Sequence, residues 1–219
     1  AKLNIAKSCF RAKPSDIAIV FQVENRMIEQ VSYGELEDLT KHVAAGLGVL
    51  GVTPGSRIAI DMPMTVESIA IYLGVIWAGC TVVGIADSFA SDEIRSRIDL
   101  AEPIIVFTQD VVRRDGKIIP LYERIKEADG PTAVVLPESR DPSRNSLRNG
   151  DIHWHEFIVK GSVDCVVCRS TDFTNILFSS GTTGVPKAIP WDHITPIKCA
   201  MDAYFHHDIS PGEIVAWPT

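Results

Sequence analysis

The sequence predicts an α/β fold with a mostly parallel sheet that helices cover on both faces. Short runs of apolar residues alternate along the chain with longer segments of helical periodicity, and this alternation is typical of strands joined by helical crossovers. The short runs are apolar at nearly every position, which is expected when both faces of a strand are buried. The chain has 219 residues, of which 46% are hydrophobic and 22% charged, enough for one large domain or two small ones.

The first predicted helix begins at Ser32, whose hydroxyl can cap the helix while Glu35 reaches back to the backbone of the capping residue. Apolar residues then recur on one helical face, and Gly51 suits the position just after the helix. A strand is expected at 57–61, followed by an apolar, largely buried helix at 66–78.

The same alternation continues toward the C-terminus. Ser91 is expected to cap a helix at 92–100. Trp154 and Phe157 are expected to face inward from a helix at 151–159. Residues 137–150 are rich in Pro, Ser, Arg, Asn and Asp and are predicted to form a surface loop within the domain. The other predicted elements are strands at 81–85, 104–108, 117–119, 132–136 and 174–178, and helices at 121–128 and 195–204.

The segment 176–187 carries the strongest indication of function. An apolar strand runs into a loop of hydroxyl residues and glycines, which Pro186 and Lys187 close. Glycines let backbone N–H groups approach an anion, hydroxyls add donors, and the lysine adds positive charge. The loop lacks the Gly-Lys-Ser/Thr end of a Walker A motif. The residues before Pro190 are expected to be extended, so the loop should join two strands. The alternative is a glycine-rich hairpin that only turns the chain.

The stretch from Ser179 to Lys187 resembles the signature loop of the adenylate-forming superfamily, which includes acyl-CoA synthetases, luciferases and peptide-synthetase adenylation domains. It matches the pattern Ser/Thr-Ser-Gly-Ser/Thr-Thr-Gly-x-Pro-Lys throughout. Segments 31–36 and 73–80 resemble two structural motifs of the same family. The resemblance implies that residues 1–219 are an incomplete N-terminal AMP-binding domain, without the later part of that domain and the small C-terminal domain.

The resemblance also implies which residues bind the phosphates of ATP. Lys187 is the implied catalytic residue. The implied phosphate-binding residues are Ser179, Ser180, Gly181, Thr182, Thr183, Gly184 and Lys187. Mg²⁺ should bridge the phosphates, but the family's carboxylate ligand belongs to a motif that this sequence does not contain, so no residue here is assigned to the metal.

A second segment, 114–121, resembles the Arg-x-Gly-Arg/Lys-x-Ile-Pro-Leu stretch of acetyl-CoA synthetases. It implies that Arg114 and Lys117 contact the 3′-phosphate of coenzyme A, with Arg113 adding charge beside them. The alternative is an ordinary basic turn. Residues 87–90, Asp-Ser-Phe-Ala, depart from the Gly-Gly-Phe-Ser stretch with which acetyl-CoA synthetases approach coenzyme A.

The implied activity is that of an AMP-forming acid-thiol ligase, most similar to acetyl-CoA synthetases and plant acyl-activating enzymes. A small carboxylic acid would become an acyl-adenylate and then an acyl-CoA thioester, and the chain alone is expected to be inactive. Two alternatives remain open: a non-catalytic nucleotide-binding module that has kept the loop, and an adenylation domain that passes its acyl group to a carrier protein. Arg114 and Lys117 favour coenzyme A over the carrier protein.

Composition excludes some other classes. The formal net charge of −7 argues against nucleic-acid binding, and no apolar run approaches the roughly 20 residues of a membrane span. Five scattered cysteines indicate reduced thiols and an intracellular location. The resemblance to plant acyl-activating enzymes adds peroxisomes to the cytoplasm as an expected compartment. Cys165 and Cys168 have Cys-x-x-Cys spacing, but without a second pair they are a weak signal for redox chemistry or a metal. The sequence does not indicate an oligomeric state.

Overall fold

The computed structural model describes residues 1–22, 27–114, 116–138, 146–179 and 186–216. Its centre is a seven-stranded sheet with the order β10-β9-β6-β4-β5-β12-β13, in which all neighbours are parallel except the last pair. The predicted α/β class with a mostly parallel sheet is therefore confirmed. The sheet strands are β4 (Arg57–Asp61), β5 (Thr81–Ile85), β6 (Ile105–Gln109), β9 (Thr132–Leu136), β10 (Ile152–His153), β12 (Phe173–Ser179) and β13 (Lys187–Asp192).

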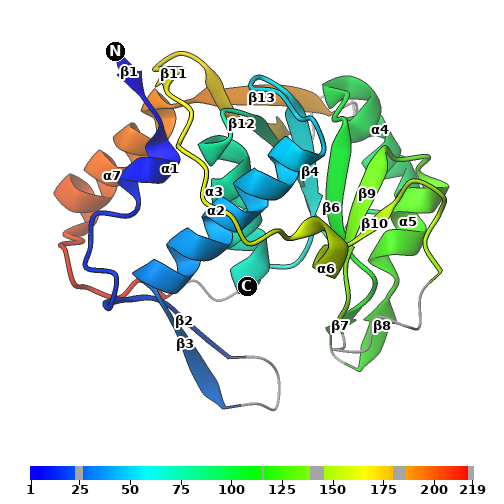
Figure 1. Ribbon diagram of the computed structural model, residues 1–219, viewed down its shortest axis with the longest axis horizontal. Coiled ribbons are helices and arrows are strands. Elements are labelled where there is room, and N and C mark those ends of the chain that lie inside the picture. Colours follow the sequence, from blue (N-terminus) through cyan, green and yellow to red (C-terminus); the bar gives the residue numbers. More distant parts are fainter. Residues whose placement is uncertain (23–26, 115, 139–145, 180–185, 217–219) are drawn as a thin grey trace.

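Helices cover the sheet on both faces, with α4 and α5 on the right in Figure 1 and α2 and α3 on the other side. Alternate residues of one strand belong to different clusters: Ile58 and Ile60 pack with α2 and α3, whereas Ala59 packs with α4 and α5. This division explains why the strands are apolar at nearly every position. The helices are α1 (Ile5–Ser8), α2 (Tyr33–Val49), α3 (Val66–Trp77), α4 (Ser91–Ala101), α5 (Leu121–Glu127), α6 (Trp154–Phe157) and α7 (Ile194–His207).

Among the described residues, three short pairs of strands lie outside the main sheet. Two of them are hairpins at the bottom of Figure 1, and the third joins the N-terminus to the strand before β12. All three are antiparallel, so they need no helical crossover. The pairs are β2 (Ile17–Gln22) with β3 (Ile28–Ser32), β7 (Val112–Arg114) with β8 (Lys117–Ile119), and β1 (Lys2–Leu3) with β11 (Cys168–Arg169).

Helix starts were predicted well where both capping partners are present. The Ser32 hydroxyl accepts from the N–H of Glu35 at 3.2 Å, and the Glu35 carboxylate accepts from the N–H of Ser32 at 2.8 Å. Gly51 has φ of 74°, which glycine adopts without the strain of a side chain. The prediction for Ser91 was wrong: Ala90 is the N-cap, and the Ser91 hydroxyl instead donates to Glu127 of α5.

The helix predicted at 151–159 was too long. Residues 152–153 form β10, and only Trp154–Phe157 are helical. Phe157 is buried as expected, and Trp154 is partly buried against the same cluster. Asp151 is not part of the helix. Its carboxylate instead holds in place the segment that returns to the sheet.

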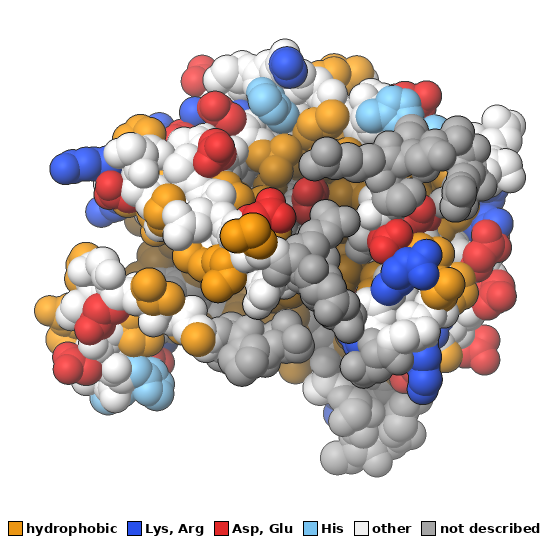
Figure 2. Space-filling model, turned by 90° about the horizontal axis from the view of Figure 1, so that it is seen from below, with side chains coloured by type: hydrophobic (Ala, Val, Ile, Leu, Met, Phe, Trp, Pro, Cys, Tyr) orange, Lys and Arg blue, Asp and Glu red, His pale blue; other side chains and the backbone are white. Residues whose placement is uncertain are grey.

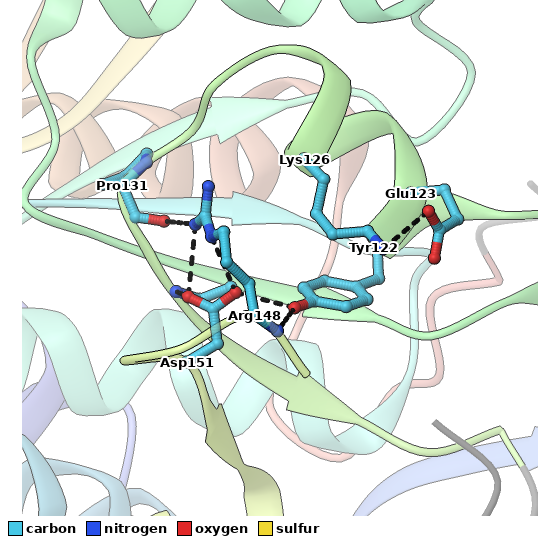
Figure 3. Close-up of polar contacts among 7 residues, drawn as sticks. Tyr122, Glu123, Lys126, Pro131, Arg148 and Asp151 are labelled. Carbon is cyan, nitrogen blue, oxygen red and sulfur yellow. Dashed lines mark hydrogen bonds and ion pairs between the residues drawn. The ribbon is translucent and has the colours of Figure 1, made fainter. Parts of the chain in front are cut away.

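Figure 3 shows this anchoring network. Asp151 accepts from the hydroxyl of Tyr122 at 2.8 Å and from the N–H of Ala133 at 2.8 Å. The guanidinium of Arg148 donates to both oxygens of Asp151, at 3.1 and 3.2 Å, and to the carbonyl of Pro131 at 2.8 Å. The predicted loop at 137–150 thus ends in a tightly held segment, while residues 139–145 lie outside the described part of the chain.

We expect Arg148→Ala to lower the free energy of unfolding by about 2 kcal/mol, because the Asp151 side chain is only 1% exposed and would keep its charge without its cation. Urea unfolding measures the change. Arg169→Ala is the matched control, since it removes an Arg–Asp pair of the same spacing whose arginine is 79% exposed. Equal losses in the two variants would contradict the importance of burial.

Helix α7 presents an apolar surface. None of its residues is buried, and the exposed large apolar side chains along it are Ile194, Ile197, Met201, Tyr204 and Phe205. An apolar stretch of this kind usually contacts another surface.

Candidate functional site

The strand order has a switch point at β4. The chain passes from β4 to β5 on one side of it and then returns to β6 on the other side. In open α/β sheets, ligands bind outside the carboxyl ends of the strands at such a point. A ligand-binding site is therefore expected among the residues at this edge.

The signature loop emerges at the same edge. β12 runs parallel to β5 and ends at Ser179, which pairs with Lys187 at the start of the antiparallel strand β13. This confirms that the loop joins two strands. Ser179 is partly buried and Lys187 is exposed. The predicted phosphate-binding residues Ser180, Gly181, Thr182, Thr183 and Gly184 lie outside the described residues.

The second predicted site lies on the β7–β8 hairpin, which follows β6. Arg114 pairs directly with Lys117 across the two strands, so their side chains share one face. Arg113 pairs with Ile118 on the opposite face. The expectation that Arg113 adds charge beside the other two was wrong, because successive residues of a strand point to opposite sides.

Each arginine of the hairpin has an acidic partner. Arg114 Nη2 lies 2.7 Å from Asp87 Oδ2, and Arg113 Nε lies 3.1 Å from Glu138 Oε1. The Arg114 side chain is 49% exposed and that of Asp87 only 15%. The carboxylate therefore lies inward of the guanidinium, which keeps an outer face open to solvent.

Asp61 at the end of β4 has no counterpart in the sequence predictions. It is 0% exposed, and neither carboxylate oxygen has a hydrogen-bond partner among the described residues. Burial and, to a lesser extent, the charge of Asp87 raise the pKa of Asp61 to about 8, although Arg124 acts in the opposite direction. The carboxyl group is therefore largely protonated at neutral pH.

Two further cations organise the segment 87–90. Arg124 of α5 donates to the carbonyls of Asp87 at 3.2 Å and Phe89 at 3.0 Å. Arg97 of α4, only 8% exposed, lies over the ring of Phe89 at 3.7 Å and near that of Phe178 at 5.6 Å. Arg97 thus contacts both the 87–90 segment and the strand that leads into the signature loop.

Figure 2 shows the lower face of the molecule, on which acidic side chains lie near the middle and both acidic and basic side chains lie on the right. Sequence reasoning missed Asp61, Arg97 and Arg124. The one available signal for Asp61 was an aspartate directly after the apolar residues 58–60 of β4, whereas nothing local distinguishes the two arginines.

Two of the cysteines are poorly suited to reactive chemistry. Burial raises the pKa of Cys80 and of Cys165 to about 11, which disfavours the thiolate needed for redox or metal chemistry. In the described part of the chain, no three His, Cys, Asp or Glu side chains are grouped so that they could hold a metal ion. No helix there is long and apolar enough to cross a membrane.

Comparison with known proteins identifies a family. The family model described as AMP-binding enzyme matches residues 6–218. The chain is 43% identical to "Probable acyl-activating enzyme 17, peroxisomal" of Arabidopsis thaliana, over 100% of this chain and 32% of that protein. It is 42% identical to "Hexanoyl-CoA synthase" of Cannabis sativa, over 99% of this chain and 32% of that protein.

A solved structure supports the fold. Acetoacetyl-CoA synthetase from Streptomyces lividans superposes with a TM-score of 0.86 at 24% identity, covering 97% of this chain and 34% of that one. At this identity the likeness concerns the fold alone. The chain spans about a third of the length of the curated relatives that it matches.

Proposed function

Because this chain belongs to the AMP-binding enzyme family, we propose that it carries the phosphate-binding half of the active site of an acyl-CoA synthetase. The protein would join a small carboxylic acid to coenzyme A at the expense of ATP. Two relatives support the reaction class, since one is named as an acyl-activating enzyme and another as a hexanoyl-CoA synthase.

The chemistry explains why ATP is needed. A carboxylate is a poor acyl donor because oxide would have to leave, so its oxygen first attacks the α-phosphate and pyrophosphate departs. The loop 180–184, between Ser179 and Lys187, supplies donors where charge grows on the pyrophosphate. Lys187 adds a full positive charge. The coenzyme A thiolate then attacks the acyl carbon, and AMP leaves.

The position of the β12–β13 strand pair, which flanks the signature loop, is the observation that supports this proposal. Ser179 and Lys187 face each other at the carboxyl edge of the sheet, and β12 lies next to β5, one of the two strands that flank the switch-point strand β4. Mg²⁺ would supply further positive charge to the phosphates. We assign its carboxylate ligand to none of the described residues, which include no group of three His, Cys, Asp or Glu side chains that could hold a metal ion.

Exchange of labelled pyrophosphate into ATP tests the proposal in the enzyme that contains this chain. We expect exchange that depends on an added carboxylic acid, with a panel of acids of increasing chain length identifying the substrate. ATP binding without exchange for any acid would favour a non-catalytic nucleotide-binding module. Exchange without thioester formation from coenzyme A would favour a carrier-dependent adenylation domain.

We assign the coenzyme A 3′-phosphate to the face of the β7–β8 hairpin that carries Arg114 and Lys117. Two cations on one exposed face suit a phosphate, and the outer side of Arg114 is open to solvent. Lys117→Ala should raise the KM for coenzyme A about fivefold and leave pyrophosphate exchange unchanged, because the pair acts only in the second step. Arg113→Ala, on the opposite face, is the control. An equal effect of both changes would contradict this assignment.

For the cellular location, we propose peroxisomes over the cytoplasm, because relatives at 43% and 37% identity are named as peroxisomal. Imaging of the tagged enzyme beside a peroxisomal marker tests this, and a diffuse cytoplasmic signal would contradict it.

A further inference from the structure

Asp87 forms an ion pair with Arg114, the residue that the proposed function assigns to a phosphate. Its carboxylate lies 2.7 Å from Arg114, on the side of the guanidinium that is turned toward the protein. Position 87 follows β5 at the carboxyl edge of the sheet and carries an aspartate. Asp87 therefore brings a negative charge to a surface where an anion is expected.

The carboxylate is not required to hold its own segment in place. Arg124 already fixes this segment through the backbone carbonyls of Asp87 and Phe89, at 3.2 and 3.0 Å. These bonds depend on the main chain and would persist with another side chain at position 87. The effect of the Asp87 side chain is thus exerted mainly on Arg114.

That effect is electrostatic. A guanidinium that already faces one carboxylate attracts a second anion less, because the nearby negative charge repels it. The Arg114 side chain is about half exposed, so solvent and salt reduce this repulsion without removing it. On this face Lys117 therefore attracts a phosphate more strongly than Arg114 does.

We propose that Asp87 is a specificity-determining residue that takes the place of the ligand's 3′-phosphate on Arg114, so that the site accepts a coenzyme A-type thiol with or without that phosphate. The inference rests on the proposed function, because it assumes that the thiol acceptor lies on this face. The ligand class is a pantetheine thiol joined to an adenine nucleotide, and dephospho-coenzyme A is the form that lacks the phosphate.

Calorimetric titration of the enzyme that contains this chain, with coenzyme A and with dephospho-coenzyme A, tests the proposal. We expect the wild-type chain to prefer coenzyme A by less than about threefold. Asp87→Asn should raise this preference to about tenfold or more by strengthening coenzyme A binding, with dephospho-coenzyme A unchanged. Adding Lys117→Ala to the Asp87→Asn chain should reduce the preference again.

Glu138→Gln is the matched control. It removes a carboxylate from the neighbouring Arg113 at 3.1 Å and changes the net charge equally, but Arg113 lies on the other face of the hairpin. The preference should therefore stay at the wild-type value. Asp87→Ser provides a second variant that lacks the charge, in case the asparagine variant does not fold.

Three results would overturn the inference. A strong wild-type preference for coenzyme A that falls in Asp87→Asn would mean that Asp87 positions Arg114 for the phosphate, and the proposed coenzyme A site would stand. Equal gains in Asp87→Asn and Glu138→Gln would reduce the effect to net charge. If neither nucleotide binds at millimolar concentration, or if Arg114→Ala and Lys117→Ala alter neither affinity, the coenzyme A site itself is wrong.

Discussion

Replacing Lys187 by alanine should slow adenylation about a hundredfold in the enzyme that contains this chain. Lys187 begins β13 directly opposite Ser179, so its position at the mouth of the loop is set by the strand pairing. In the proposed reaction its charge matters most as pyrophosphate departs, and deletion of one preorganised stabilising group typically costs about 10²–10³ in rate. Binding of the carboxylic acid should change little. Pyrophosphate exchange gives the rate, and the KM for the acid gives the binding.

Lys198→Ala is the control for this prediction. Lys198 lies on α7, the next helix, where its side chain is 66% exposed and paired with Asp202. This substitution removes the same charge from the neighbouring helix. Wild-type exchange in Lys187→Ala, or an equal loss in both variants, would refute a specific role of Lys187. A rise in the KM for the acid with an unchanged rate would move Lys187 from the phosphates to the carboxylate.

The main sheet could be predicted from the sequence because its strands are buried on both faces. β4, β5 and β9 were predicted with the bounds that the structure shows. Short antiparallel pairs were harder. β2 and β3 carry exposed apolar residues such as Val20 and Ile28, so their pattern lacks the alternation that a half-buried strand would show.

The signature loop could be recognised because its residues are adjacent in sequence. The cluster at the sheet edge could not, since it forms from separate elements: Asp87 follows β5, whereas Arg114 lies 27 residues later on β7. Sequence reasoning marked Arg114 as a phosphate ligand without seeing that an acidic residue already contacts it. Topology brings the two together, because β5 and β6 flank the same central strand, β4.

Asp61 should make the protein less stable as the pH rises from about 4 to about 8. In the unfolded chain this carboxyl loses its proton near its ordinary pKa of 3.8, whereas burial raises the pKa in the folded protein to about 8. Between these values the native state binds more protons than the unfolded state, so the free energy of unfolding falls with pH by up to about 1.4 kcal/mol per unit. From pH 5 to pH 7 the loss should be about 3 kcal/mol.

Asp61→Asn tests this by removing the charge while keeping the shape. The buried amide costs a roughly constant amount at every pH, so the diagnostic quantity is the slope of stability against pH, measured by urea unfolding at pH 5, 6 and 7. We expect a much smaller slope in this variant and an unchanged slope in Asp99→Asn, an exposed aspartate on α4. Asp87→Asn should give an intermediate slope, because the charge of Asp87 is the second cause of the raised pKa.

If Asp61→Asn keeps the wild-type slope, the Asp61 carboxyl is already ionised in the folded protein and has a partner, such as Arg124 in another rotamer. The edge of the sheet would then carry one more negative charge at neutral pH than proposed here, which would weaken any anion site at Arg114.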